Sequence, residues 1–378
     1  MDRTPELPDG LVRPGLAAVD PYEPGRPIES VQRETGLGRV VKLASNEGPL
    51  PPFPAAIQAI AEAAAGQRLY PDPGAWALRD ALERHTGVPA DQILPGAGID
   101  SLIKQIAQVA LDPGDELVMG WPSFLSWRQQ GLVQGARPVT VGLAANGAYD
   151  LDAVLAAVTP RTKLVVVVSP NNPTGGTVRA ADLVAFLDRV PDHAMPVLDE
   201  AYFEYLRPGS HDGGALLRDG RPLAVLRTFS KAFGLAGLRA GYLMAPRPLL
   251  AEIQRVRSVF DINGVAQAAA TASLAEAADE LPRRIAMNEA ERRLIGDGIR
   301  ALGLDPLASD ANFVMVDLGS PERARAAYEG LLARGVIVRP LRAFGAPAAI
   351  RITTGLPEET PVLLEAMAGV IGELPAAA

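Results

Sequence analysis

Residues that could do chemistry follow three short apolar runs in this sequence. Asn172 comes after the run Leu164–Val168, Asp199 follows Pro196–Leu198, and Lys231 comes a few residues after the third run. A lysine amine can act as a nucleophile or carry a proton when its surroundings lower its pKa. A carboxylate can pair with a cationic partner and hold it protonated. If the chain brings these groups together, they form a site for nucleophilic and proton-transfer chemistry.

The elements that must position these residues alternate between helix and strand. The run LVVVV is apolar on every side, which is typical of a strand buried on both faces of a parallel sheet. Such strands in alternation with helices predict an α/β fold with a mostly parallel central sheet covered by helices. We expect helices at 55–65, 75–84, 99–110 and 180–189, and strands at 116–119, 163–168, 196–198, 223–226 and 241–245.

The length of 378 residues predicts more than one core. Residues 1–45 are rich in Pro, Gly and charge, and we expect an arm that packs on the small domain or on a dimer partner. Residues 46–248 are expected to form the large domain, and residues 249–378 a small α+β domain. In the small domain we expect helical structure over 249–303 with a break or kink at Pro282, strands at 312–317, 336–338 and 350–353, and helices at 322–333 and 357–371.

Composition argues against several classes of protein. The net charge is −8 and the pI is about 5.1, so the chain has no general attraction for nucleic acid or an anionic membrane. It has no cysteine, which fits a reducing, cytoplasmic location, and its three histidines have no metal-ligand spacing. The first ten residues lack the apolar core of a signal peptide, and no apolar stretch is long enough to span a bilayer. We therefore expect no metal, nucleic-acid or membrane partner.

Ligands of open parallel sheets bind beyond the carboxyl ends of the strands, where the three groups fall. The ordered set NNPTGG, DEAY and TFSKAFGLAGLR resembles the aspartate-aminotransferase superfamily, class I/II, of pyridoxal-5′-phosphate (PLP) enzymes. Further segments resemble its histidinol-phosphate aminotransferase branch, and the similarity runs from about Pro21 to Gly355. These segments are PYEPGRPIE, ASNEGPL, YPDPGAWALRDAL, PGAGIDSLI, WPSF, ANFVMV and IRITTG.

The resemblance implies a set of residues around the cofactor ring. Lys231 would carry PLP as a Schiff base and then move the proton between substrate and cofactor. Asp199 would pair with the pyridinium nitrogen, so that the ring can accept electrons. Tyr202 and Asn172 would hydrogen-bond the phenolic oxygen, and Phe124 would lie over the ring face.

The resemblance also implies a phosphate site and a dimer. Arginine can hold phosphate through two parallel bonds, hydroxyls can donate to it, and a helix N-terminus offers free backbone N–H groups. Tyr70 matches a residue that reaches the phosphate from the other subunit, so the active site would require a homodimer. The other residues expected at the phosphate are Gly98, Ile99, Asp100, Thr228, Ser230 and Arg239.

At the substrate end, the resemblance implies that Arg351 binds an anionic group and that Arg339 and Tyr22 help to hold a substrate phosphate. Asn46 lies in the loop that closes over the substrate. Two anion receptors would let one pocket accept a phosphorylated amine and glutamate in turn. The expected reaction is a ping-pong transfer of an amino group between a donor, with histidinol phosphate favoured, and 2-oxoglutarate or glutamate.

Departures from the family pattern leave other substrates open. The phosphate loop usually reads GNGSDE and here reads GAGIDS, the arm loop reads NEG in place of NEN, and Phe124 stands where tyrosine is common. Relatives with similar motifs act on aromatic amino acids, and a PLP decarboxylase of a phosphorylated amino acid is a further alternative. A nicotinamide dehydrogenase is disfavoured because GAGIDS lacks the third glycine of GxGxxG. A PLP-fold regulator is disfavoured because the chain has neither a basic segment nor spare length for a DNA-binding module.

Overall fold

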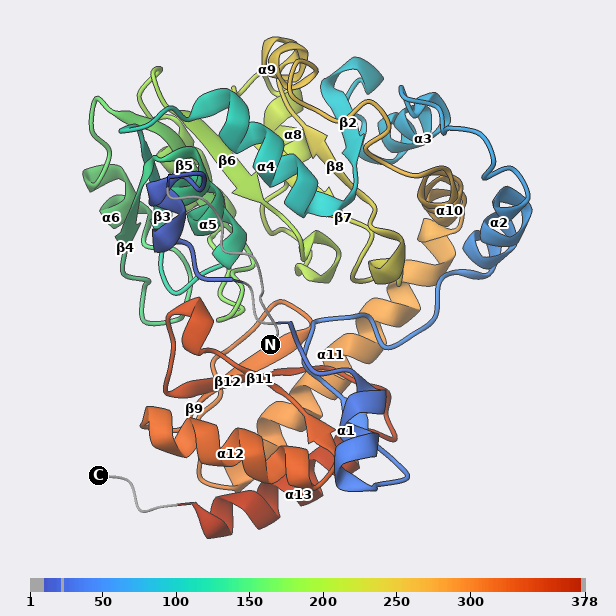
Figure 1. Cartoon of the computed structure of the whole chain (residues 1–378), viewed down its shortest axis with the longest axis vertical. Helices are drawn as coiled ribbons and strands as arrows, with labels where there is room; N and C mark the ends of the chain where they lie inside the picture. The colour runs from blue at the N-terminus through green and yellow to red at the C-terminus, as the bar shows by residue number, and fades with distance from the viewer. Residues whose placement is uncertain (1–9, 22–23, 375–378) are drawn as a thin grey trace, which may run out of the picture.

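The computed structural model describes residues 10–21 and 24–374 and contains a large central sheet (Figure 1). The strand order is β2-β8-β7-β6-β5-β3-β4, and β8 alone runs antiparallel to its two neighbours. The predicted α/β fold with a mostly parallel sheet is confirmed. The strands are β2 (Ile93–Gly96), β3 (Glu116–Gly120), β4 (Arg137–Val141), β5 (Thr162–Val168), β6 (Met195–Asp199), β7 (Ala224–Thr228) and β8 (Gly241–Met244).

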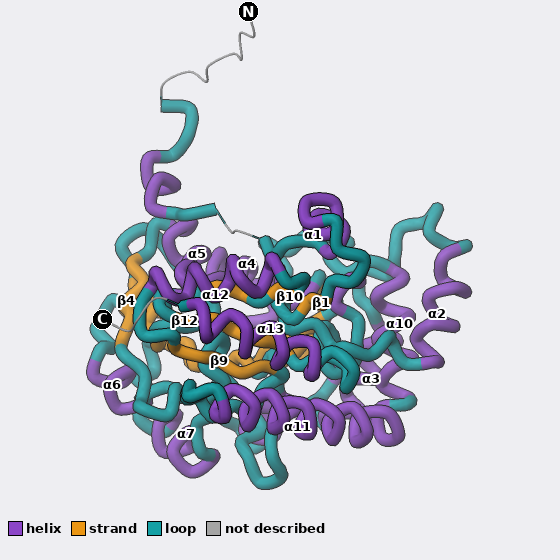
Figure 2. The backbone as a smooth tube through the Cα atoms, turned by 90° about the horizontal axis from the view of Figure 1, so that it is seen from below, coloured by secondary structure: helices purple, strands orange, loops and turns teal. Residues whose placement is uncertain are grey.

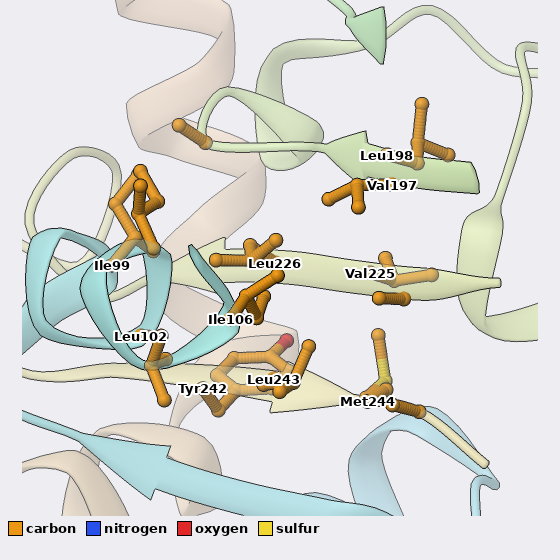
Figure 3. Packing of buried hydrophobic residues seen from close by; sticks show 14 of the residues in the cluster. Ile99, Leu102, Ile106, Val197, Leu198, Val225, Leu226, Tyr242, Leu243 and Met244 are labelled. Atoms are coloured by element: carbon orange, nitrogen blue, oxygen red, sulfur yellow. The ribbon is translucent and has the colours of Figure 1, made fainter. Parts of the chain in front are cut away.

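Helices pack around this sheet and bury its apolar side chains. α4 lies against β7 and β8, where Ile99, Leu102 and Ile106 approach Leu226 and Leu243 (Figure 3). β5 is buried along nearly its whole length, as its continuous apolar run predicts. The helices of this part are α2 (Pro54–Ala64), α3 (Trp76–Thr86), α4 (Gly98–Ala110), α5 (Leu125–Gln134), α6 (Leu151–Ala156), α7 (Ala180–Leu187), α8 (Gly213–Arg218), α9 (Arg247–Ile253) and α10 (Gly264–Ala275).

A second, smaller core contains the chain's C-terminal part and one segment from near its N-terminus. Its three-stranded antiparallel sheet has the order β11-β12-β9, and β1 pairs in parallel with β10. Figure 2 shows α11, α12 and α13 gathered on the side of these strands that faces the viewer. The elements are α1 (Ile28–Thr35), β1 (Val41–Lys42), α11 (Ala277–Ala301), β9 (Phe313–Asp317), α12 (Pro321–Ala333), β10 (Val336–Ile337), β11 (Arg339–Pro340), β12 (Ala349–Thr353) and α13 (Thr360–Glu373).

The long helix α11 belongs to both cores. Leu281 and Ile285 pack against the core of the large sheet, whereas Ile295 and Ile299 lie in the smaller core. Of the break or kink expected at Pro282, the break is wrong, because α11 continues through this residue. Packing of Leu281 and Ile285 and the ion pairs of Arg283 and Arg284 with Glu280 stabilise the helix around the proline, which lacks a backbone N–H.

Buried residues between Leu250 and Ala277 pack into the core of the large sheet, which places the change of core within α11 rather than at residue 248. The three-part division into an arm and two domains stays a prediction. The described N-terminal residues have two kinds of contact. Arg13 donates to the carbonyl of Val133 in α5, and Val31 of α1 packs with Ile337 of β10.

Candidate active site

A cavity of about 540 Å³ opens at the carboxyl ends of β5, β6 and β7 and is lined by residues of both cores. It brings together most of the residues predicted for the site. Of the remaining ones, Gly98 lies beside the cavity, Tyr70 lies on the surface, and Tyr22 lies outside the described residues. The predicted residues that line the cavity are Asn46, Ile99, Asp100, Phe124, Asn172, Asp199, Tyr202, Thr228, Ser230, Lys231, Arg239, Arg339 and Arg351.

Lys231 stands three residues beyond the end of β7, and its Nζ lies 5.8 Å from the centre of the Tyr202 ring. Burial, helped by the positive charges of Arg351 and Arg239, lowers the pKa of Lys231 to about 8. Such an amine is mostly protonated near physiological pH, but its neutral fraction is far larger than that of an ordinary lysine, and the neutral form is the nucleophile. The backbone of Lys231 is packed closely too, since a Cβ on Gly48 would lie 2.4 Å from its carbonyl oxygen.

Asp199 is the last residue of β6 and is fully buried. The indole Nε1 of Trp127 donates to its Oδ2 at 2.9 Å, and the backbone N–H of Ala201 donates to its Oδ1 at 3.2 Å. Burial raises the pKa of Asp199 to about 6, and these two donors oppose that rise. The carboxylate is therefore available, at neutral pH, as a partner for a cation in the cavity.

The start of α4 and Arg239 form an end of the cavity suited to an anion. The first backbone N–H groups of a helix have no partner within the helix and attract negative charge. Arg239 Nη2 lies 3.3 Å from Asp100 Oδ2, and a Cβ on Gly98 would approach the same Nη2 to 2.6 Å. Only glycine lets the guanidinium lie this close to the helix start. The hydroxyls of Thr228 and Ser230 are 2.9 Å apart and line the same cavity.

Two arginines stand side by side at another end of the cavity. Arg339 of β11 and Arg351 of β12 are direct partners in the antiparallel pairing, and both side chains are buried. Arg351 donates to Asn172 Oδ1 and to the carbonyl of Ala44. Both guanidiniums lie 5.5 Å from the centre of the Phe344 ring. The pair provides two positive charges facing one space.

Asn46 connects the smaller core to the cavity. It is buried and adopts a positive φ of 54°, a conformation that asparagine tolerates better than most residues. Its Nδ2 donates to the hydroxyl of Tyr202 at 2.8 Å, and its Oδ1 accepts from Thr353 at 3.0 Å. Asn46 thereby fixes the position of the tyrosine hydroxyl.

Phe124 and Tyr70 have different environments. Phe124 occupies the N-cap position of α5 and lines the cavity. Tyr70 is 80% exposed and stacks on Phe260 with ring centres 4.3 Å apart. It does not line the cavity of its own chain, so its predicted role across a dimer interface stays a prediction.

The structure adds residues that the sequence argument missed. Trp127 bonds Asp199, while Asp261 accepts from the backbone N–H of Ala97 at 3.1 Å and from Ser101 Oγ at 2.7 Å, at the start of α4. The spacing of Phe124 and Trp127, one helical turn apart, was the signal available for the tryptophan. Asp261 follows no motif and could be found only from the fold. Further lining residues are Glu47, Ser126, Gln129 and Phe344.

Residues 10–21 and 24–374 contain no cluster of three or more His, Asp or Glu side chains placed to hold a metal ion. In the same part of the chain, every helix is too short or too polar to cross a membrane.

The fold and the cavity define a class of enzyme, and comparison with known proteins identifies the same class. The family model of aminotransferase class I and II matches residues 38–367. The chain belongs to this family, and it is a PLP-dependent transaminase. The predicted family, class of enzyme and cofactor are confirmed.

Similar proteins carry two kinds of substrate name. A histidinol-phosphate aminotransferase of Anaeromyxobacter sp. (strain Fw109-5) is 42% identical over 96% of this chain and 99% of its own. An aromatic amino acid aminotransferase of Rhodococcus opacus (strain B4) is 44% identical over 93% and 94%. A solved structure of histidinol-phosphate aminotransferase from Sinorhizobium meliloti, in complex with PLP, is 31% identical with a TM-score of 0.87, covering 96% of this chain and 98% of that one.

Proposed function

We propose that this transaminase moves an amino group between histidinol phosphate and 2-oxoglutarate or glutamate by a ping-pong mechanism, as a step of histidine biosynthesis. The observation that carries the proposal is the pair of adjacent buried arginines, Arg339 and Arg351, facing the cavity that contains Lys231. A substrate that carries an anionic group at some distance from its reacting carbon can bind to such a pair of guanidinium groups. Curated relatives that are about 40% identical and named for this activity support the choice.

The residues present fit the cofactor. The cavity offers an amine at Lys231, a buried carboxylate at Asp199 and an anion site at the start of α4 with Arg239. The close approach of Arg239 to Gly98 is a packing arrangement that a side chain at residue 98 would block. When bound, PLP supplies an aldehyde that reacts with amines and a ring that withdraws electrons.

The side chains then divide the work by position. Lys231 Nζ would hold the cofactor, and its amine would afterwards carry the proton between the Cα of the substrate and the aldehyde carbon of the cofactor. Asp199 keeps a proton on the ring nitrogen by pairing with it. Tyr202 and Asn172 orient the ring oxygen, and Phe124 covers the ring face.

The remaining groups hold the phosphate of the cofactor and the substrate. Thr228, Ser230 and the first backbone N–H groups of α4, at Ile99 and Asp100, donate to the phosphate together with Arg239. Arg351 binds the carboxylate of glutamate, and Arg339 joins it for a substrate phosphate. Asn46 lies in the loop that closes over the substrate, and Tyr22 helps Arg339 to hold a substrate phosphate. We further propose a homodimer in which Tyr70 reaches the partner's phosphate site, and a cytoplasmic location.

The first test replaces the lysine on which the chemistry depends. Purified protein with PLP should show the visible absorption of a covalently bound cofactor. Lys231→Ala should lose that absorption and at least about 1000-fold in turnover, because Lys231 is the one lysine among the described residues that line the cavity. Lys104→Ala, on the exposed side of α4, serves as the matched control. A colourless protein that turns over without PLP would contradict the proposal.

A donor panel separates the substrate alternatives. Histidinol phosphate and the aromatic amino acids are each supplied with 2-oxoglutarate, and the keto product, glutamate and carbon dioxide are measured. An aromatic donor is the second candidate because the curated relative with 44% identity carries that name and because Phe344 lies beside both arginines. Failure of histidinol phosphate as donor would reject the favoured substrate. Release of carbon dioxide would instead indicate a decarboxylase.

A further inference from the structure

The buried carboxylate of Asp199 has an unusual hydrogen-bond partner. In the part of the chain that the structure describes, Trp127 is the one side chain that bonds it, through indole Nε1 to Oδ2 at 2.9 Å. Trp127 is itself fully buried in the core of the large sheet. The bond is therefore shielded from water. A hydrogen bond to a charged group is strongest in such a buried environment.

The position of Trp127 follows from the helix that carries it. Phe124 stands at the N-cap position of α5 and Trp127 lies one turn further along, so the two aromatic side chains lie on the same side of the helix. Phe124 lines the cavity, whereas Trp127 lies outside it and reaches the carboxylate. One helical turn thus supplies a contact in the cavity and a support for Asp199.

An indole N–H can only donate, because indole nitrogen neither accepts a hydrogen bond nor ionises in this range. Its bond to Asp199 therefore favours the carboxylate over the protonated acid and opposes the effect of burial. The nearby carboxylates act in the opposite direction, since Asp100 and Glu200 both raise the pKa of Asp199. The buried hydroxyl of Tyr149 also lies near, and the charge of Asp199 raises the pKa of that hydroxyl.

The ionisable network next to Asp199 does not take over this role. His211 Nδ1 lies 3.0 Å from Glu200 Oε1, and its Nε2 lies 2.8 Å from the hydroxyl of Ser169. Glu200 is also paired with Arg227 at 2.7 Å. The side chains of these groups are satisfied among themselves, and none of them bonds the carboxylate of Asp199.

On the basis of the proposed pairing of Asp199 with the cofactor's ring nitrogen, we infer that Trp127 is a positioning residue. Its indole N–H fixes Oδ2 and keeps Asp199 ionised, and it cannot exchange a proton with it. This arrangement differs from one built on histidine, which could itself titrate next to the carboxylate. The residue that keeps Asp199 ionised is therefore itself neutral.

The test measures cofactor affinity against pH on protein stripped of PLP, with Trp127→Phe as the first variant. Loss of a donor to a charged group should weaken PLP binding about tenfold or more near neutral pH. The acid limb of the binding curve should also move to higher pH, because Asp199 would become protonated more easily. Phe186→Leu removes buried volume from the same core without touching Asp199, and should leave both quantities unchanged.

A second variant separates the donor from the ring. Replacement of Trp127 by β-(3-benzothienyl)alanine keeps the bicyclic shape and removes only the N–H, so it decides the question if Trp127→Phe fails to fold. Both readouts should change as for Trp127→Phe. Unchanged affinity and an unchanged acid limb in a folded variant would overturn the inference. Wild-type protein that forms no covalent chromophore with PLP would overturn the proposed function instead.

Discussion

The lysine amine and the buried carboxylate are tuned in opposite directions by one low-dielectric cavity. Burial is the largest cause of both shifts, since it lowers the pKa of Lys231 to about 8 and raises the pKa of Asp199 to about 6. Their residue types and their order along the chain were evident in the sequence. The shifts themselves were not, because they depend on Arg351, more than a hundred residues away from either group, and on Trp127.

The lowered pKa of Lys231 predicts that burial of this amine destabilises the folded, cofactor-free protein, and that the destabilisation depends on pH. The unfolded chain keeps this lysine protonated up to pH of about 10.5, whereas the folded chain releases the proton near pH 8. The cost of burying the amine is therefore full below pH 8 and disappears as the pH rises toward about 10.

Lys231→Met should accordingly be more stable than wild type below pH 8, by on the order of 2 kcal/mol, with a difference that shrinks toward pH 10. Chemical denaturation of cofactor-free protein at several pH values measures this. Lys104→Met is the control on an exposed surface. A difference of the same size at both ends of the pH range would contradict the prediction.

At the scale of elements, the sequence predicted the interior of the sheet better than its edges. The central strands β5, β6 and β7 were predicted within one or two residues of the observed bounds, whereas β2 and β4 were missed. Both missed strands are edge strands and each contains a proline, Pro95 and Pro138. Proline is tolerated in edge strands, where one side of the strand has no hydrogen-bonded neighbour. A proline within a short run argues against a strand, so the sequence pattern did not predict β2 and β4.

The start of α4 predicts a second test at this scale. Asp261 accepts hydrogen bonds from Ala97 N, Ser101 Oγ and Gln105 Nε2, and so holds the loop that presents the helix N-terminus. Asp261→Ala leaves these donors without their acceptor, at a cost of roughly 1–3 kcal/mol.

We expect Asp261→Ala to lower the melting temperature and to weaken PLP binding by about tenfold, since the phosphate site loses its support. Calorimetry and equilibrium dialysis measure the two effects. Asp182→Ala, on the surface of α7, is the control. An unchanged dissociation constant would show that Asp261 stabilises the fold without shaping the phosphate site.

At the scale of the whole molecule, two segments, one around Tyr70 and one around Val259, contain exposed large apolar side chains. Leu69 is 62% exposed and Val259 is 66% exposed, and Tyr70 stacks on Phe260, which joins the two segments. A surface of this kind favours association with another protein surface. The proposed homodimer would cover it and bring Tyr70 to the partner's site.

Val259→Glu should therefore convert a dimer into monomers and reduce PLP affinity, because a charge buried in an apolar interface is costly. Analytical ultracentrifugation at micromolar concentration measures the first effect. Leu294→Glu introduces the same charge at an exposed residue of α11, away from this surface. Wild-type protein that sediments as a fully active monomer would contradict the proposal.

The helix α11 affects how the two cores unfold. Its first turns pack on the core of the large sheet and its last turns are buried in the smaller core, so neither core keeps all its contacts if the other releases the helix. The stabilities of the two cores are therefore coupled through this one continuous helix. Binding energy gained at the large sheet therefore also stabilises the smaller core.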